Sequence, residues 1–167
     1  MGRILNRLLW FIGLAFLQVL LLNKIWWFGV ATPFLYIYFI LTMDQSVSRS
    51  KLMLWSFALG LVVDIFSNTF GIHAASATLI AFLRPMFLRF FFLRDENDIF
   101  EPHMVTLGTG KFVGYALICT LVHHMAVCLL EFFTLSHPLL IIFRIVACTA
   151  ITMVFVLAVE LIRFRKS

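Results

Sequence analysis

The chain has 167 residues, of which 63% are hydrophobic and 13% are charged, and its mean hydropathy is +1.05. A water-soluble domain is typically about half apolar and about a quarter charged, so this composition excludes an ordinary soluble domain and predicts a protein that crosses a lipid bilayer. The formal net charge is +5. Because the basic residues lie in short clusters between apolar runs, and not among exposed aromatic side chains, we expect membrane lipid and no nucleic acid as a partner.

Apolar runs separated by short polar turns predict an all-α polytopic membrane protein, with about six transmembrane helices in one bundle and a single domain, 1–167. The first run follows Arg3 and Arg7, as in a signal peptide, but lacks a small-residue cleavage site, so we interpret it as an uncleaved first span. The second run is short and reaches the length of a span only when the residues after the Trp26–Trp27 pair are included. The expected spans are 8–27, 28–43, 52–66, 72–88, 112–133 and 139–162.

An even number of spans places both termini on one side of the membrane. The basic residues favour the cytoplasm for that side, because loops rich in lysine and arginine are retained there. Lys24 and Arg144 fall on the opposite side. The residues on the side of the termini are Arg3, Arg7, Arg49, Lys51, Arg84, Arg89, Arg94, Lys111, Arg163, Arg165 and Lys166.

The end of the fourth span contains a basic and aromatic stretch. The Arg84–Pro85 pair is expected to weaken or kink the helix, since proline lacks a backbone N–H. The residues that follow, 86–94, have two arginines five positions apart among aromatic side chains, as in a helix that leaves the membrane along its surface. Arg84, Arg89 and Arg94 are therefore candidates for a cytoplasmic interface with lipid headgroups or a partner.

The third span contains the most informative polar residues. Ser56, Gly60 and Asp64 follow one another at intervals of four residues, so they share one helix face. Small residues at this spacing allow a second helix to approach closely. An ionisable group inside a bilayer is costly, so Asp64 is expected to face the bundle interior with a partner, and His73 and Arg144 are the two candidates.

A plainer interpretation of the same residues is that Asp64 only stabilises the turn that follows it. In that case the Asp64 side chain caps or pins the turn through Ser67 and Asn68, and Gly71 only ends that turn. Both interpretations are compatible with the sequence.

The motif also resembles a known family. Gly60-x-x-x-Asp64, followed by Gly71-Ile-His73-Ala74 and a Leu/Ala-rich helix that ends in an arginine, resembles the signature of the rod shape-determining protein family MreD. The chain length, the number of apolar runs, the basic N-terminus and the short tail are similar to that family as well. In motif the resemblance covers residues 55–84.

The resemblance implies a non-enzymatic membrane scaffold of the bacterial cell-elongation complex, which couples cytoplasmic filaments to peptidoglycan synthesis. It implies a multi-pass protein of the bacterial cytoplasmic membrane, with MreC, MreB, RodA and a class B penicillin-binding protein as partners. Ser56, Gly60, Asp64, Gly71 and His73 would then serve structure or partner binding. The MreD bundle is also similar to the substrate-binding subunits of energy-coupling-factor transporters.

Two alternatives remain open from the residues. A transporter-like, small-molecule-binding subunit would line a midplane cavity with Asp64, His73, His124 and Arg144. His123 is a further candidate for lining such a pocket.

The second alternative is a metal or haem carrier that uses His123 and His124. Cys119 and His123 stand at i, i+4, and so do His124 and Cys128. Metal sites need three or four convergent ligands, and the other spans offer few. We therefore expect no cofactor and no metal.

Enzyme signatures are absent from the sequence, which has no nucleophile elbow, zinc-protease motif, phosphate loop or dinucleotide-binding motif. No catalytic residue is expected. Glu131 and Glu160 lie near opposite ends of their helices, where each is expected to act as an interfacial anchor.

Overall fold

The structure is a computed structural model that describes residues 2–24, 32–91, 101–131 and 138–164. The regular structure of these residues is helical, with no strand among them. The elements are α1 (Gly2–Leu20), η1 (Leu22–Lys24), α2 (Ile37–Thr42), α3 (Arg49–Ser67), α4 (Ile72–Phe91), α5 (Met104–Leu107), α6 (Thr109–Glu131) and α7 (Pro138–Phe164).

Five helical segments are long and apolar enough to cross a bilayer. Their outward faces are apolar, as side chains such as Leu54, Ile65 and Val154 show. This is the character of a multi-pass membrane protein, and it confirms the all-α membrane fold at that level. The five segments are Leu5–Lys24, Arg49–Ser67, Ile72–Phe91, Thr109–Glu131 and Pro138–Arg163.

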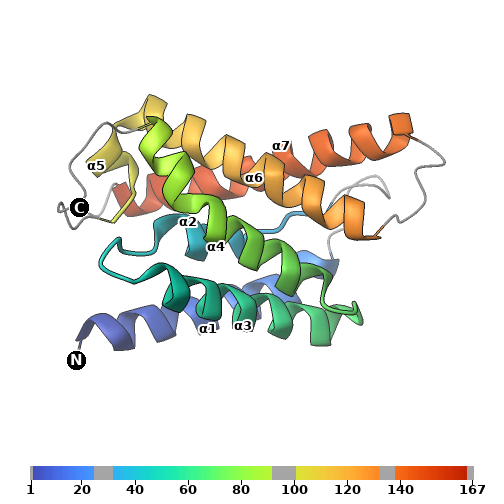
Figure 1. Cartoon of the computed structure of the whole chain (residues 1–167), viewed down its shortest axis with the longest axis horizontal. Helices are drawn as coiled ribbons and strands as arrows, with labels where there is room; N and C mark the ends of the chain where they lie inside the picture. Colours follow the sequence, from blue (N-terminus) through green and yellow to red (C-terminus); the bar gives the residue numbers. More distant parts are fainter. Residues whose placement is uncertain (1, 25–31, 92–100, 132–137, 165–167) are drawn as a thin grey trace.

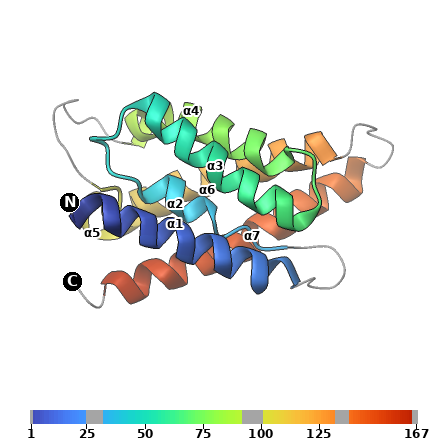
Figure 2. The same cartoon turned by 90° about the horizontal axis from the view of Figure 1, so that it is seen from below.

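The long helices run roughly side by side along the molecule. Helix α4 packs between α3 and α6, α7 packs against α6, and α1 packs against α3. The start of α1 and the end of α7 lie at the same end of the bundle in both views (Figures 1 and 2). We call this the terminal end, and the opposite end, which carries the α3–α4 turn, the distal end.

The prediction that the second crossing is one continuous helix is wrong. Within 32–43 only α2 is helical, six residues long, and residues 32–34 are extended. The segment nevertheless runs through the middle of the bundle from the distal end towards the terminal end (Figures 1 and 2). Pro33 explains the break, because it donates no backbone hydrogen bond and disfavours helical geometry at Thr32. Residues 28–31 of the predicted span lie outside the described part.

This broken crossing is the most deeply buried part of the described chain. Tyr36, Ile37, Tyr38, Ile40 and Leu41 are fully buried. A non-helical backbone at membrane depth is tolerated only where protein surrounds it, because lipid cannot satisfy its polar groups. The segment therefore forms the centre around which the long helices pack.

Helix α4 continues through Pro85 to Phe91, so the proline does not end it. The guanidinium of Arg49 donates two hydrogen bonds, at 3.1 and 2.6 Å, to the carbonyl oxygen of Phe82 in the turn before the proline. It also lies 3.8 Å from the centre of the Phe82 ring. An arginine of α3 thus stabilises the turn that the proline weakens. The stretch expected to leave the membrane is continuous with α4 as far as residue 91.

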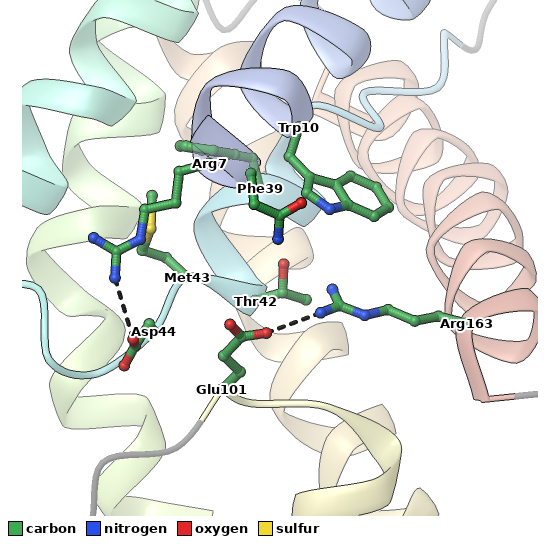
Figure 3. A pocket seen from close by; sticks show the side chains of 9 residues that line it. Arg7, Trp10, Phe39, Thr42, Met43, Asp44, Glu101 and Arg163 are labelled. Carbon is green, nitrogen blue, oxygen red and sulfur yellow. Dashed lines mark hydrogen bonds and ion pairs between the residues drawn. The ribbon is translucent and has the colours of Figure 1, made fainter. Parts of the chain in front are cut away.

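Ion pairs lock the terminal end, as the small pocket in Figure 3 shows. Arg7 of α1 lies 3.1 Å from Asp44, which follows α2, and Arg163 of α7 lies 2.9 Å from Glu101. In Figure 3 the two pairs face one pocket from opposite sides. Its volume is about 40 Å³, enough for little more than water. These pairs tie the ends of α1 and α7 to the segments that precede α3 and α5.

Candidate functional site

The motif residues of α3 hold α4 in place by close contact. A Cβ atom on Gly60 would lie 2.5 Å from the Ala74 Cα and from the His73 carbonyl oxygen. Real Cβ atoms do not approach backbone this closely, so α4 can begin here only because residue 60 has no side chain. Ser56, one turn earlier on the same face, is also fully buried. This face of α3 is therefore an intramolecular surface.

Asp64 closes α3 and opens α4. Its backbone carbonyl accepts from Asn68, which has the left-handed φ of 55°, and from Thr69. Its carboxylate accepts hydrogen bonds from the backbone N–H groups of His73 at 3.0 Å and Ala74 at 2.8 Å, and from the Thr69 hydroxyl at 2.5 Å. These N–H groups belong to the first turn of α4, whose exposed donors and helix dipole favour a negative charge.

Asp64 thus holds the turn, as the plainer interpretation has it, but its carboxylate does so through Thr69, His73 and Ala74 and not through Ser67 and Asn68. Gly71 contributes a positive φ of 79° to the turn, a conformation that favours glycine. Of the two predicted partners, His73 contacts Asp64 through its backbone rather than its ring. Arg144 lies at the distal end and donates to Glu131 at 3.1 Å.

The extended part of the broken crossing is held by side chains of two other helices. Gln18 of α1 donates to the carbonyl of Pro33 at 2.9 Å and accepts from the N–H of Tyr36 at 3.4 Å. Thr152 of α7 accepts from the N–H of Phe34 at 3.0 Å. Backbone groups that a helix would satisfy internally are therefore paired with fully buried polar side chains.

The other end of the broken crossing is held by Arg84, which is 3% exposed. Its guanidinium donates to the carbonyl oxygens of Leu41 and Met43 and, at 3.1 Å, to the hydroxyl of Tyr115. The Tyr115 hydroxyl donates to the Leu41 carbonyl at 3.1 Å. The last carbonyls of α2 have no intrahelical partner, and a cation at this end is favoured by the helix dipole.

Arg84 is therefore not the cytoplasmic interface residue that the sequence predicted, because its side chain is buried at the end of α2. Arg89 is exposed on the last turns of α4, where such an interface is possible. Arg94 lies outside the described residues.

A polar centre lies where α4 and α6 meet the broken crossing. The Tyr36 hydroxyl lies 3.2 Å from Nδ1 of His73 and 2.6 Å from Nε2 of His123. A hydroxyl has one proton, so it donates to one imidazole and accepts from the other. Tyr36 and His123 are fully buried, and Nδ1 of His123 has no hydrogen-bond partner among the described residues.

His124 belongs to the same centre but serves a different contact. Its Nδ1 lies 2.8 Å from the carbonyl of Thr120, its Nε2 lies 3.3 Å from the hydroxyl of Thr152, and its ring stacks on Phe34. The three histidine rings surround the extended segment, but no three His, Cys, Asp or Glu side chains in the described residues converge as metal ligands do. The buried Cys119 and Cys128 are free thiols.

Glu160 is not an interfacial anchor either, because it is 1% exposed. It accepts hydrogen bonds from the Tyr38 hydroxyl at 2.6 Å and from the N–H of Met104 at 2.8 Å, and lies 3.2 Å from Nδ1 of His103. A buried carboxylate needs such donors. Glu160 thereby links α7 to the broken crossing and to the start of α5. Glu131, in contrast, is exposed at the distal end.

A cavity of about 380 Å³ opens at the distal end, and we call it the distal cavity. It extends from the ends of α1, α3 and α6 inwards to the polar centre, which it reaches at Phe34 and His73. Its polar lining includes Asn23, Lys24, His73, Glu131 and Arg144. Of the predicted pocket-lining residues, Arg144 lines this cavity, whereas His123 and His124 do not. Its volume lies within the range of small-ligand pockets.

Comparison with known proteins gives no relative. No family model, no curated protein and no solved structure matches the chain.

Several residues of the site gave no signal in the sequence analysis. Gln18, Tyr36 and Thr152 are single polar or aromatic residues in apolar runs. Only the tertiary structure shows that Gln18 and Thr152 bond the backbone of the broken crossing and that Tyr36 bonds two histidines. The one available signal was Pro33, which lies inside the predicted second helix.

Proposed function

We propose that the chain is a non-enzymatic membrane scaffold of the bacterial cell-elongation complex, as its resemblance to MreD implies. The observation that supports the proposal is the α3–α4 hairpin. Gly60, Asp64 and Gly71, scattered over twelve residues, act in one structural unit: the first allows the contact, the second caps α4 and the third completes the turn.

The polar groups inside the bundle also suit a structural role. Asp64, Arg84 and Glu160 are buried, and each is bonded to backbone groups at the end of another helix. These helices are α4, α2 and α5, respectively. Gln18 and Thr152 pair with the extended segment in the same way. In this account they hold one defined arrangement of the helices, whose lipid-facing sides and two ends contact the partners.

The proposed partners are MreC, MreB, RodA and a class B penicillin-binding protein, in the bacterial cytoplasmic membrane. The described basic residues fit cytoplasmic termini, since those of the terminal end outnumber Lys24 and Arg144 at the distal end.

Replacing Asp64 tests the role of the hairpin in cells. Asp64→Ala leaves two buried N–H groups of α4 without an acceptor, and we expect a loss of about 2–3 kcal/mol in the free energy of unfolding. The expected cellular result is loss of rod shape when the variant is the sole copy, measured by cell width, with the amount in the membrane followed by immunoblot. Asp64→Asn keeps an acceptor oxygen and should be milder. Normal width with Asp64→Ala would contradict the assignment.

A second candidate function is a small-molecule-binding subunit like those of energy-coupling-factor transporters. The observation that favours it is the distal cavity, which reaches the broken crossing, since discontinuous helices commonly line substrate sites in transporters. A bound metabolite that copurifies with the chain would support this function over the scaffold.

A further inference from the structure

We infer that the distal cavity binds a phosphate group, carried either by a lipid headgroup or by a small soluble anion. The inference is independent of the scaffold proposal, and it gives the ligand class of the second candidate function. It rests on the charges of the cavity wall, on the polar groups left without partners there, and on the position of the cavity.

Polar groups in the cavity wall and next to it have no partner among the described residues. The ammonium of Lys24 has no partner among the described residues, and Nε2 of His73 makes no hydrogen bond with any of them. His73 is 5% exposed, so its ring is buried everywhere except where it lines the cavity. The Tyr36 hydroxyl connects His73 to His123, which lies deeper in the bundle. The buried Nδ1 of His123 also has no partner among these residues. A ligand or water is expected to fill the donors and acceptors that remain.

Other polar side chains of the wall are engaged within the protein. The Asn23 amide donates to Ser67 at 2.7 Å, and the Thr69 hydroxyl donates to Asp64. They shape the cavity without competing for a ligand. The carboxylate of Asp64 is bonded to N–H groups of the first turn of α4, and Asp64 does not line the cavity.

The balance of the remaining charges favours an anion. Lys24 and Arg144 are cations, whereas Glu131 is the one carboxylate among the described residues that line the cavity. The Arg144–Glu131 pair is partly exposed, with side-chain exposures of 23% and 38%, so it is worth little in free energy. Lysine and arginine side chains, both present in this wall, are the usual protein partners of a phosphate.

The position of the cavity makes a lipid an available source of that phosphate. It opens at the ends of the membrane-spanning helices, where lipid headgroups lie. Its wall also includes apolar side chains, Phe66 and Ile72 among them, which suit the glycerol and first methylenes of a phospholipid.

The test is a titration of the purified full-length chain in nonionic detergent, with inorganic phosphate in one arm and short-chain phosphatidylglycerol in the other. Lys24→Gln removes the unpaired cation, and we expect it to weaken binding about threefold or more, the loss of one partly exposed ion pair. Glu131→Gln removes the competing carboxylate and should strengthen binding by a similar factor. Lys51→Gln, an exposed lysine at the terminal end, is the matched control and should leave binding unchanged.

Each outcome decides between sources or rejects the site. Binding of phosphatidylglycerol alone assigns the site to a lipid headgroup, and binding of inorganic phosphate as well assigns it to the phosphate group itself. Binding of neither ligand would overturn the inference. So would equal weakening by Lys24→Gln and Lys51→Gln, which would indicate a general effect of net charge.

Discussion

Gly60→Ala is expected to destabilise the bundle by about 3 kcal/mol, although alanine is the better helix former. The added Cβ would lie 2.5 Å from the Ala74 Cα and from the His73 carbonyl oxygen. Both are backbone atoms, so neither can move without shifting the first turn of α4. That shift would also pull the N–H groups of α4 away from the Asp64 carboxylate.

Gly13→Ala is the matched control for this variant. Gly13 lies in the interior of α1, and a Cβ there would meet nothing within 4 Å. We expect no loss of stability, and a gain of up to about 1 kcal/mol from helix propensity. Unfolding by denaturing detergent in mixed micelles, followed by circular dichroism, measures both variants. Equal stability of the two would show that the α3–α4 contact is looser than the structure has it.

Arg84→Met is expected to cost about 3 kcal/mol, because it removes the donors at the end of α2. The carbonyl of Met43 and one hydrogen bond to Leu41 would lose their partner in a buried setting. Arg84→Lys should fall between Met and the native residue, since one ammonium cannot reproduce the planar fork of a guanidinium.

Arg89→Met is the control for Arg84, since Arg89 is an exposed arginine on the same helix. We expect it to change the free energy of unfolding by less than about 1 kcal/mol. Amide hydrogen exchange gives a local readout, in which Arg84→Met speeds exchange in α2 before the long helices open. Protection of α2 that does not depend on residue 84 would contradict the proposed role of the guanidinium.

The sequence predicted most where hydrophobic length and local spacing decide the structure. The five long helices follow from apolar runs that match the bilayer, and their bounds differ from the expected ones by only a few residues at most ends. The Ser56–Gly60–Asp64 face also follows from helical periodicity alone. Its partner helix is the next one in the chain, so a local motif sufficed to locate it.

The second crossing could not be predicted in the same way. Hydropathy reports whether side chains suit an apolar setting, and it does so equally for a helix and for an extended segment inside a bundle. The break is possible only because Gln18 and Thr152, more than a hundred residues apart, supply hydrogen bonds to one short segment. Such non-local pairing has no periodic signature.

Arg84 and Glu160 were misplaced for a related reason. A charged residue near the end of an apolar run is usually solvated at the membrane surface, and that rule gave an interface residue and an anchor. In the structure each faces inward, because α2 and α5 present unpaired backbone groups there. These two charged side chains are buried because they pair with the ends of α2 and α5, two short helices that hydropathy does not detect.

The most direct test of the scaffold proposal is an affinity purification of the chain from its native membranes in mild detergent. Mass spectrometry then identifies both the proteins and the small molecules that remain bound. We predict recovery of MreC and cell-wall synthases at levels well above those in an untagged control, and no stoichiometric soluble metabolite. Recovery of an ATPase module or a stoichiometric metabolite, without those proteins, would contradict the scaffold and establish a transport subunit instead.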